Sequence, residues 1–185
     1  AAVSDAYSSM RTALAALSST SGAFGFANGV EWFAKEKIDV HEASALNWGA
    51  RINQNGLIAR LNTILALHPA FHDGALTEFV DCGPVNAVLF TRTDADGKNA
   101  VIVAVNLEQS RSVTLEWAPS YTPFVAEMGE TPATDLISGR RFGLSCSAAG
   151  KFRIQLPASK FVCLSTERAW MARIETAEKS PGLAI

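Results

Sequence analysis

Four acidic residues lie close together early in the chain, and two tryptophans flank them. The acids are Glu31, Glu36, Asp39 and Glu42, and the tryptophans are Trp32 and Trp48. Cleavage of a glycosidic bond needs one carboxylic acid and one carboxylate on opposite sides of a sugar, and an exposed indole can stack on the apolar face of that sugar. A solvated acidic loop with partly buried tryptophans is the more frequent outcome of such a pattern. Glu31 and Trp32 are the pair to test first.

Other combinations of reactive residues are incomplete. His68 and His72 have the spacing of metal ligands on one helix face, but Pro69 interrupts that helix and no carboxylate completes a ligand set. Asp94 and Asp96 resemble the start of a calcium loop, but that loop would need glycine and glutamate at positions that hold Asn99 and Val105; a hairpin turn explains them. The sequence also has no nucleophile motif and no glycine-rich phosphate loop. We therefore expect neither a metal site nor a cofactor.

The composition predicts a folded chain. Its 185 residues are 48% hydrophobic and 18% charged, which suits one domain, or one domain with part of another. The 16 basic and 18 acidic side chains give a net charge of −2, so no basic surface is expected to bind nucleic acid. No apolar run reaches the roughly 18–20 residues that cross a bilayer.

Three cysteines, Cys82, Cys146 and Cys163, are too few and too irregularly spaced for a disulfide framework or a zinc site. All three lie in apolar segments. We expect buried free thiols and a reducing, cytoplasmic location.

The hydrophobic pattern changes near residue 73. Before it, apolar residues recur at helical spacing from Ser4 to Leu17 and again from Asn55 to Leu67, where His68-Pro69 ends the helix. The glycine-rich apolar run Ala23–Val30 between them predicts a buried strand, and a long loop follows at 33–53.

After residue 73 the pattern is that of short strands. The best hairpin joins 85–93 to 100–107 through a turn containing Asp96-Gly97. Further strands are expected at 76–82, 112–117, 124–128, 151–156 and 160–166. About seven strands without intervening helices predict an antiparallel sandwich, and the tail from 167 to 185 could begin as a helix.

Several stretches, in this order, resemble the α-amylase superfamily from about residue 5 to 166. In the first half they are Gly29–Trp32, Lys35–Val40, Asn47–Trp48, Leu57–Asn62 and His68–Phe71, which look like the final strand, loop and helix of its barrel. In the second half they are Asn86–Arg92, Ala100–Leu107, Phe161–Leu164 and Thr134–Gly139, the last a D-L-(L/I)-(S/T)-G stretch. These look like the β-sandwich that follows the barrel.

The resemblance implies a mainly β fold: a C-terminal antiparallel β-sandwich preceded by the last helix–strand–helix segment of a (β/α)8 barrel. The implied division is an incomplete barrel portion at 1–73, the sandwich at 74–166 and a tail at 167–185.

The loop after the barrel strand looks most like that of α-glucan maltosyltransferases and related bacterial proteins. There a Lys-Tyr pair contacts the phosphate of the sugar donor; Lys37 matches the lysine, whereas Ile38 replaces the tyrosine. The implied substrate-binding residues are Glu31, Trp32 and Lys37, and the implied partners are an α-glucan or maltooligosaccharide and the rest of the barrel. The family's three catalytic acids lie on earlier barrel strands, so the resemblance implies no catalytic residue here and an inactive fragment of a glycoside hydrolase or glucanotransferase.

Two alternatives stay open beside the enzyme fragment. One is a free-standing carbohydrate-binding module that presents Trp117 or another aromatic. The other is a structural domain that forms a homo-oligomer through the apolar segment Ala23–Val30. Whether the parent enzyme hydrolyses, transfers or isomerises is not decided by these residues.

Overall fold

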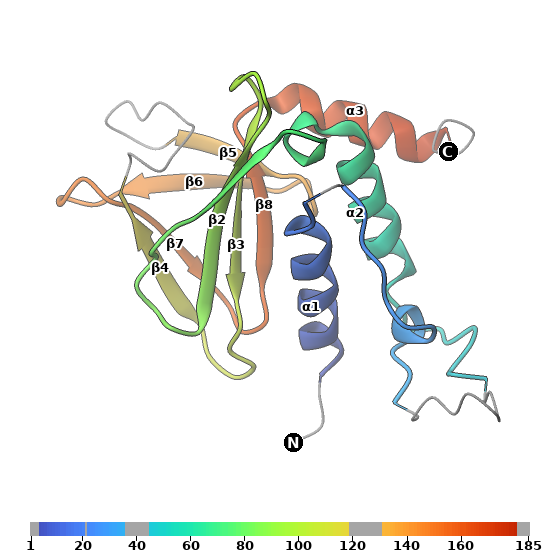
Figure 1. The fold of residues 1–185 in the computed structure, drawn as a ribbon. Helices are drawn as coiled ribbons and strands as arrows, with labels where there is room; N and C mark the ends of the chain where they lie inside the picture. The colour runs from blue at the N-terminus through green and yellow to red at the C-terminus, as the bar shows by residue number, and fades with distance from the viewer. Residues whose placement is uncertain (1–3, 21, 36–44, 119–130, 181–185) are drawn as a thin grey trace.

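A computed structural model describes residues 4–20, 22–35, 45–118 and 131–180. Within these residues, three α-helices lie beside a strongly curled antiparallel sheet of eight strands (Figure 1). The mainly β fold class with an antiparallel sandwich is thereby confirmed.

The helices begin and end close to where the sequence predicts. α1 runs over Asp5–Leu17, and its N-cap Ser4 accepts a hydrogen bond from the backbone N–H of Tyr7 through its side chain. α2 runs over Asn55–Leu67, with Gln54 as its N-cap. α3, at Arg168–Lys179, confirms the helix expected at the start of the tail. Two short 3-10 helices are η1 at Val30–Trp32 and η2 at Pro69–Phe71.

Six strands fall within predicted segments and two do not. The expected ones are β1 (Leu76–Phe79), β2 (Ala87–Thr93), β3 (Ala100–Asn106), β4 (Val113–Trp117), β7 (Phe152–Leu156) and β8 (Phe161–Ser165). The unexpected ones are β5 (Thr131–Asp135) and β6 (Arg141–Cys146). The strand expected at 124–128 lies outside the described residues.

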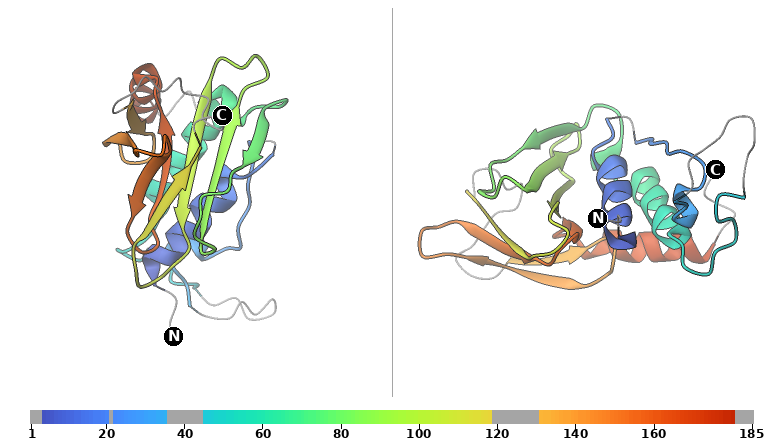
Figure 2. Two further views of the ribbon diagram at one scale, coloured as in Figure 1. Left: turned by 90° about the vertical axis from the view of Figure 1, so that its left-hand side faces the viewer. Right: turned by 90° about the horizontal axis from the view of Figure 1, so that it is seen from below.

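The strand order is β1-β2-β3-β8-β5-β6-β7-β4, with every pair antiparallel. β6 turns the corner between the two layers of the sandwich, because its first four residues, 141–144, pair with β5 and its last two, Ser145 and Cys146, pair with β7. At the other end, the Glu116 N–H donates to the Cys82 carbonyl at 3.0 Å. The curled sheet therefore brings β4 next to the segment that follows β1 (Figure 2).

The central strands are covered on both faces, which explains why β3 is an almost unbroken apolar run. One core lies between the two layers of the sheet and contains Leu89, Ile102 and Trp117. The other lies between the sheet and the helices, where Phe90 and Val103 meet Met10 of α1 and Ile64 of α2. An Arg60–Glu178 ion pair at 2.9 Å also links α2 to α3.

The motif at 134–139 is a turn organised by one buried carboxylate. Asp135 accepts hydrogen bonds from the backbone N–H groups of Ile137, Ser138 and Cys163, at 3.0 to 3.2 Å, and from the Ser138 hydroxyl. Gly139 has φ of 71°, a left-handed conformation that glycine adopts without steric cost. The aspartate, serine and glycine therefore fix the turn between β5 and β6 and hold it against β8.

Three expectations need correction. The segment 23–30 is not a buried strand: residues 25–28 are exposed, and none of the described residues pairs with it, so it lacks the ladder that defines a strand. Trp117 is 1% exposed and packs on Phe152, because it points between the layers, so it cannot present its ring to a sugar. Cys146 is an exposed free thiol, since it lies on the outer face at the end of β6; Cys82 and Cys163 are buried free thiols as expected.

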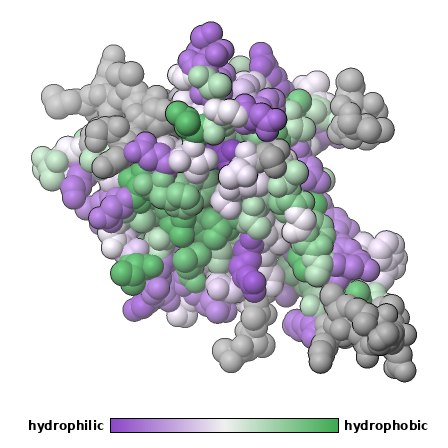
Figure 3. All heavy atoms as spheres, in the orientation of Figure 1, coloured by the Kyte–Doolittle hydropathy of each residue, from purple (hydrophilic) through white to green (hydrophobic). Residues whose placement is uncertain are grey.

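The surface also carries large apolar side chains. Apolar residues gather over the strands on the face seen in Figure 3, bordered by polar ones. The most exposed large hydrophobic residues on or next to β1 and β2 are Leu76, Phe79 and Val85. Among the described residues no helix has both the length and the apolar character needed to cross a membrane.

Candidate functional site

The loop between α1 and α2 is anchored by the buried residue Gln54. Its side-chain amide donates to the Val30 carbonyl at 2.8 Å, and its backbone N–H donates to the Glu31 carbonyl at 2.9 Å. Gln54 is only 3% exposed and directly precedes α2. It therefore fixes η1, which contains Glu31 and Trp32, relative to the start of this helix.

Glu31 is half-buried and turned back toward its own backbone. Its Oε2 accepts a hydrogen bond from the Gly29 N–H at 2.9 Å. Gly29 has φ of 94°, and a Cβ atom there would lie 3.0 Å from the Cβ atoms of Ala34 and Leu46. Glycine is thus required on both conformational and packing grounds, and the Glu31 carboxylate stabilises the turn that glycine makes.

Trp32 and Trp48 form an aromatic pair at this loop. Their ring centroids are 5.1 Å apart with the planes tilted by 52°. The Asn47 side-chain amide donates to the Trp32 carbonyl at 2.6 Å, which ties the two segments together. Trp48 is 73% exposed, whereas Trp32 is half-buried beneath it. The outer indole therefore has a face open to solvent and an aromatic support behind it.

The turn that carries Trp48 has an unusual backbone. Leu46 and Asn47 both have positive φ, at 44° and 59°, and Gly49 has φ of 75°. Leu46 is 8% exposed and fits against Gly29. The left-handed conformation costs a residue like leucine on the order of 1 kcal/mol, which burial of its side chain offsets. This arrangement directs Trp48 outward.

The structure places Trp32 and Trp48 in contact, with Glu31 next to Trp32 in η1. Lys37 lies outside the described residues, as do Glu36, Asp39 and Glu42. The role of Gln54 was not predicted. A glutamine in front of an apolar helical run is only a weak sequence signal. Local patterns could not show the contact of Gln54, because its partner Val30 lies more than twenty positions earlier in the chain.

The two histidines lie in different surroundings. His68 is buried and its Nδ1 accepts a hydrogen bond from the Ala70 N–H at 3.3 Å, whereas His72 is exposed. Within the described part of the chain, no group of three histidine, cysteine or acidic side chains is placed to hold a metal ion. The Asp94–Asn99 segment is the expected hairpin turn, with the Asp94 Oδ1 accepting from the Lys98 and Asn99 N–H groups.

No protein-family model matches this chain, and no curated protein does. Among solved structures, the chain is similar to a noncanonic maltogenic α-amylase, AmyB, from Thermotoga neapolitana. The TM-score is 0.65 at 14% sequence identity, and the match covers 86% of this chain but 36% of that one. The likeness establishes an amylase-like fold. Because it covers most of the chain, it takes in both the helical part and the sheet.

Proposed function

We propose that this chain is the C-terminal part of an α-amylase-family enzyme that acts on α-glucans by hydrolysis or transfer. The observation that carries the proposal is the structural likeness over 86% of the chain to a maltogenic α-amylase. The order of motifs along the sequence supports it independently. In this proposal the catalytic acids belong to barrel strands that precede the chain, and the helical part packs against them.

The loop at 29–54 would form one wall of the sugar cleft. Trp48 offers an exposed indole on which the apolar face of a glucosyl ring can stack, with Trp32 behind it. Glu31 and Lys37 are the polar residues that we assign to the same wall. We also propose a cytoplasmic location, on the basis of the three free cysteines.

Replacing Trp48 by alanine should weaken maltooligosaccharide binding. Loss of one stacked aromatic contact is worth about 0.5–1.5 kcal/mol, which corresponds to a roughly 2- to 10-fold increase in Kd. Isothermal titration of the 185-residue chain with maltoheptaose measures this change without depending on the fluorescence of the removed indole.

Ile52→Ala is the matched control, because Ile52 is 69% exposed near the same turn but offers no aromatic face. Its Kd should stay at the value of the unmodified chain. Equal affinities of the unmodified chain and of Trp48→Ala would contradict the assignment of Trp48 to the proposed cleft.

The origin of the chain has a separate test. The gene that encodes it should specify, upstream, the earlier strands of a barrel with two aspartates and one glutamate at the family's catalytic positions. A gene without such a segment would contradict the enzyme assignment and favour a free-standing module.

A further inference from the structure

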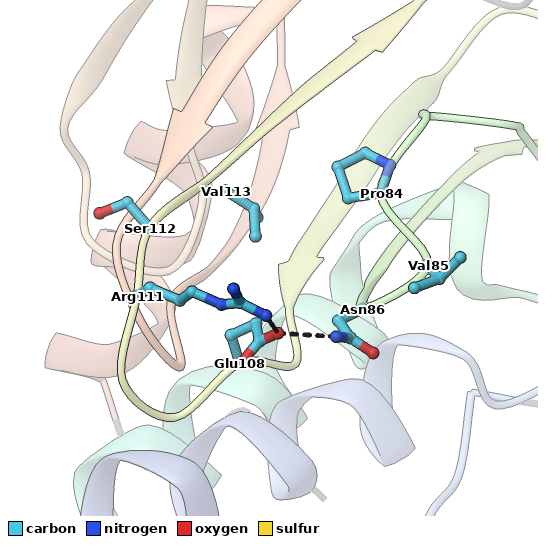
Figure 4. A pocket seen from close by; sticks show the side chains of 7 residues that line it. All are labelled: Pro84, Val85, Asn86, Glu108, Arg111, Ser112 and Val113. Carbon is cyan, nitrogen blue, oxygen red and sulfur yellow. Dashed lines mark hydrogen bonds and ion pairs between the residues drawn. The ribbon is translucent and has the colours of Figure 1, made fainter.

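A hollow lies on the sheet, between the turn that leads into β2 and the loop that joins β3 to β4 (Figure 4). It has a volume of about 300 Å³ and is lined by Pro84, Val85, Asn86, Glu108, Arg111, Ser112 and Val113. η1 and the sheet lie on opposite sides of α1, so the hollow is separate from the Trp32–Trp48 pair (Figures 1 and 2).

A polar cluster occupies one wall of this hollow. Glu108 Oε1 accepts hydrogen bonds from Asn86 Nδ2 at 2.6 Å and Arg111 Nη2 at 2.7 Å. The hydrogen bond from Arg111 and then that from Asn86 lower the pKa of Glu108, so its carboxylate stays ionised. Its other oxygen, Oε2, has no hydrogen-bond partner among the described residues. An ionised acceptor and the remaining guanidinium donors therefore lie side by side.

The cluster is held in place by a buried asparagine at the end of β3. The Asn106 side-chain amide donates to the carbonyls of Arg111 at 2.9 Å and Pro157 at 2.8 Å, and its Oδ1 accepts from the Glu108 N–H at 2.8 Å. The Leu107 N–H donates to the Asn86 carbonyl at 3.0 Å, which connects the two walls. The backbone on both sides is thus fixed before any ligand arrives, which lowers the entropic cost of binding.

The charges of the cluster indicate the type of ligand. The charges of Glu108 and Arg111 cancel. An anion would therefore be repelled by the carboxylate, and a cation would be repelled by the guanidinium. A neutral molecule with adjacent hydroxyl groups satisfies both, because each hydroxyl can donate to Oε2 or accept from the guanidinium. Pro84 and Val113 supply apolar surface near the polar wall, and the volume lies at the lower end of the range for small-molecule pockets.

We propose that this hollow binds one neutral pyranose ring, a glucosyl unit of an α-glucan, through adjacent hydroxyls that bridge Glu108 and Arg111. The choice of glucan rests on the proposed function, whereas the choice of a neutral polyhydroxylated ring rests on the hollow alone. The described residues that line the hollow include no aromatic side chain, so the affinity should be in the millimolar range.

The test is an NMR titration of the ¹⁵N-labelled chain with maltotriose. Saturable shifts are expected for the backbone amides of 85–87 and 108–113. Glu108→Gln should raise the Kd reported by these amides at least 5-fold, because the ionised acceptor is lost while the shape is kept. Glu116→Gln is the matched control, since Glu116 also pairs with an arginine, Arg153, on the sheet surface but outside the hollow, and its Kd should not change.

Three results would overturn the inference: no saturable shift at these amides, equal weakening by both variants, or displacement of maltotriose by acetate or ammonium at comparable concentration. Shifts confined to the amides around Trp48 would also overturn it while supporting the proposed function. Saturable shifts in the hollow with no change near Trp48 would support the inference and count against the proposed cleft.

Discussion

Replacing Arg92 by methionine is expected to lower the free energy of unfolding by roughly 3 kcal/mol. Arg92 lies on β2 and is fully buried. Its Nε and Nη1 donate to backbone carbonyls, whereas its Nη2 is buried with no hydrogen-bond partner among the described residues. Nε donates to the Ala70 carbonyl at 2.8 Å, and Nη1 donates to the carbonyls of Leu17 and Ser19. The guanidinium also lies 4.8 Å from the centroid of the Phe71 ring.

The physical reason lies at the end of α1. Leu17 is the last residue of this helix, so its carbonyl has no partner within the helix and carries part of the negative end of the helix dipole. Burial lowers the pKa of Arg92, but the side chain stays charged and interacts favourably with that end. Methionine fills a similar volume without a donor. Three carbonyls then lose this hydrogen bond: the buried ones of Ala70 and Leu17 and the partly buried one of Ser19. Each buried carbonyl left unsatisfied costs about 1–3 kcal/mol, partly offset because no charge is desolvated.

Urea unfolding followed by far-UV circular dichroism measures the effect, and a Tm decrease of roughly 6–12 °C should accompany it. Arg153→Met is the matched control, because Arg153 is exposed and forms an exposed ion pair with Glu116; the unfolding free energy of this variant should change by less than about 0.5 kcal/mol. Equal stability of Arg92→Met and the unmodified chain would contradict this prediction. It would mean that the free-energy cost of burying the guanidinium equals the stabilisation from its hydrogen bonds.

Arg92 also illustrates what the sequence could not predict. Its position in an apolar strand marks it as unusual, but its partners are as many as 75 positions away in the chain. Local patterns predicted α1, α2 and the hairpin of β2 and β3, because these elements are specified by residues close in sequence. They missed β5 and β6, where Pro132 and Gly143 weaken the strand pattern and where β6 changes partner after Leu144.

The candidate binding residues also divide into those visible in the local sequence and those that depend on distant contacts. The sequence pointed to Glu31, Trp32 and Trp48, because acids and tryptophans in a long loop are visible without a structure. It did not indicate the hollow at Glu108, which depends on Asn106 reaching the carbonyls of two separate loops. An asparagine at the end of a β-branched run, followed two positions later by a glutamate, is the one local sign that could have led there.

Acidification should destabilise the protein between pH 6.5 and about 4 because of His68. Burial lowers the pKa of His68 to about 4; the Asp94 carboxylate opposes this shift and His72 adds to it. His68 is fully buried, and its ring centroid lies 4.6 Å from that of Trp170 of α3 with the planes tilted by 44°. Its Nδ1 accepts a hydrogen bond from the Ala70 N–H. In the unfolded chain this histidine takes up a proton near pH 6.5.

The sign follows from proton uptake. Between the two pKa values the unfolded state binds more protons than the folded state, so stability is full above pH 6.5 and decreases as the pH falls toward 4. The total contribution of His68 is about 3 kcal/mol, because each unit of pKa difference corresponds to about 1.4 kcal/mol. Below pH 4 both states are protonated and this group causes no further loss.

Unfolding free energies measured in urea at intervals from pH 7.5 to 4 should reveal this loss. In His68→Asn the decrease should be largely absent, because asparagine keeps an acceptor for the Ala70 N–H but cannot be protonated. His72→Asn should keep the decrease in unfolding free energy, since His72 is exposed and this variant retains the buried His68. A similar pH dependence in all three proteins would assign the acid sensitivity to carboxylates. A flat profile for His68→Asn alone would assign the acid sensitivity to protonation of the buried His68 ring.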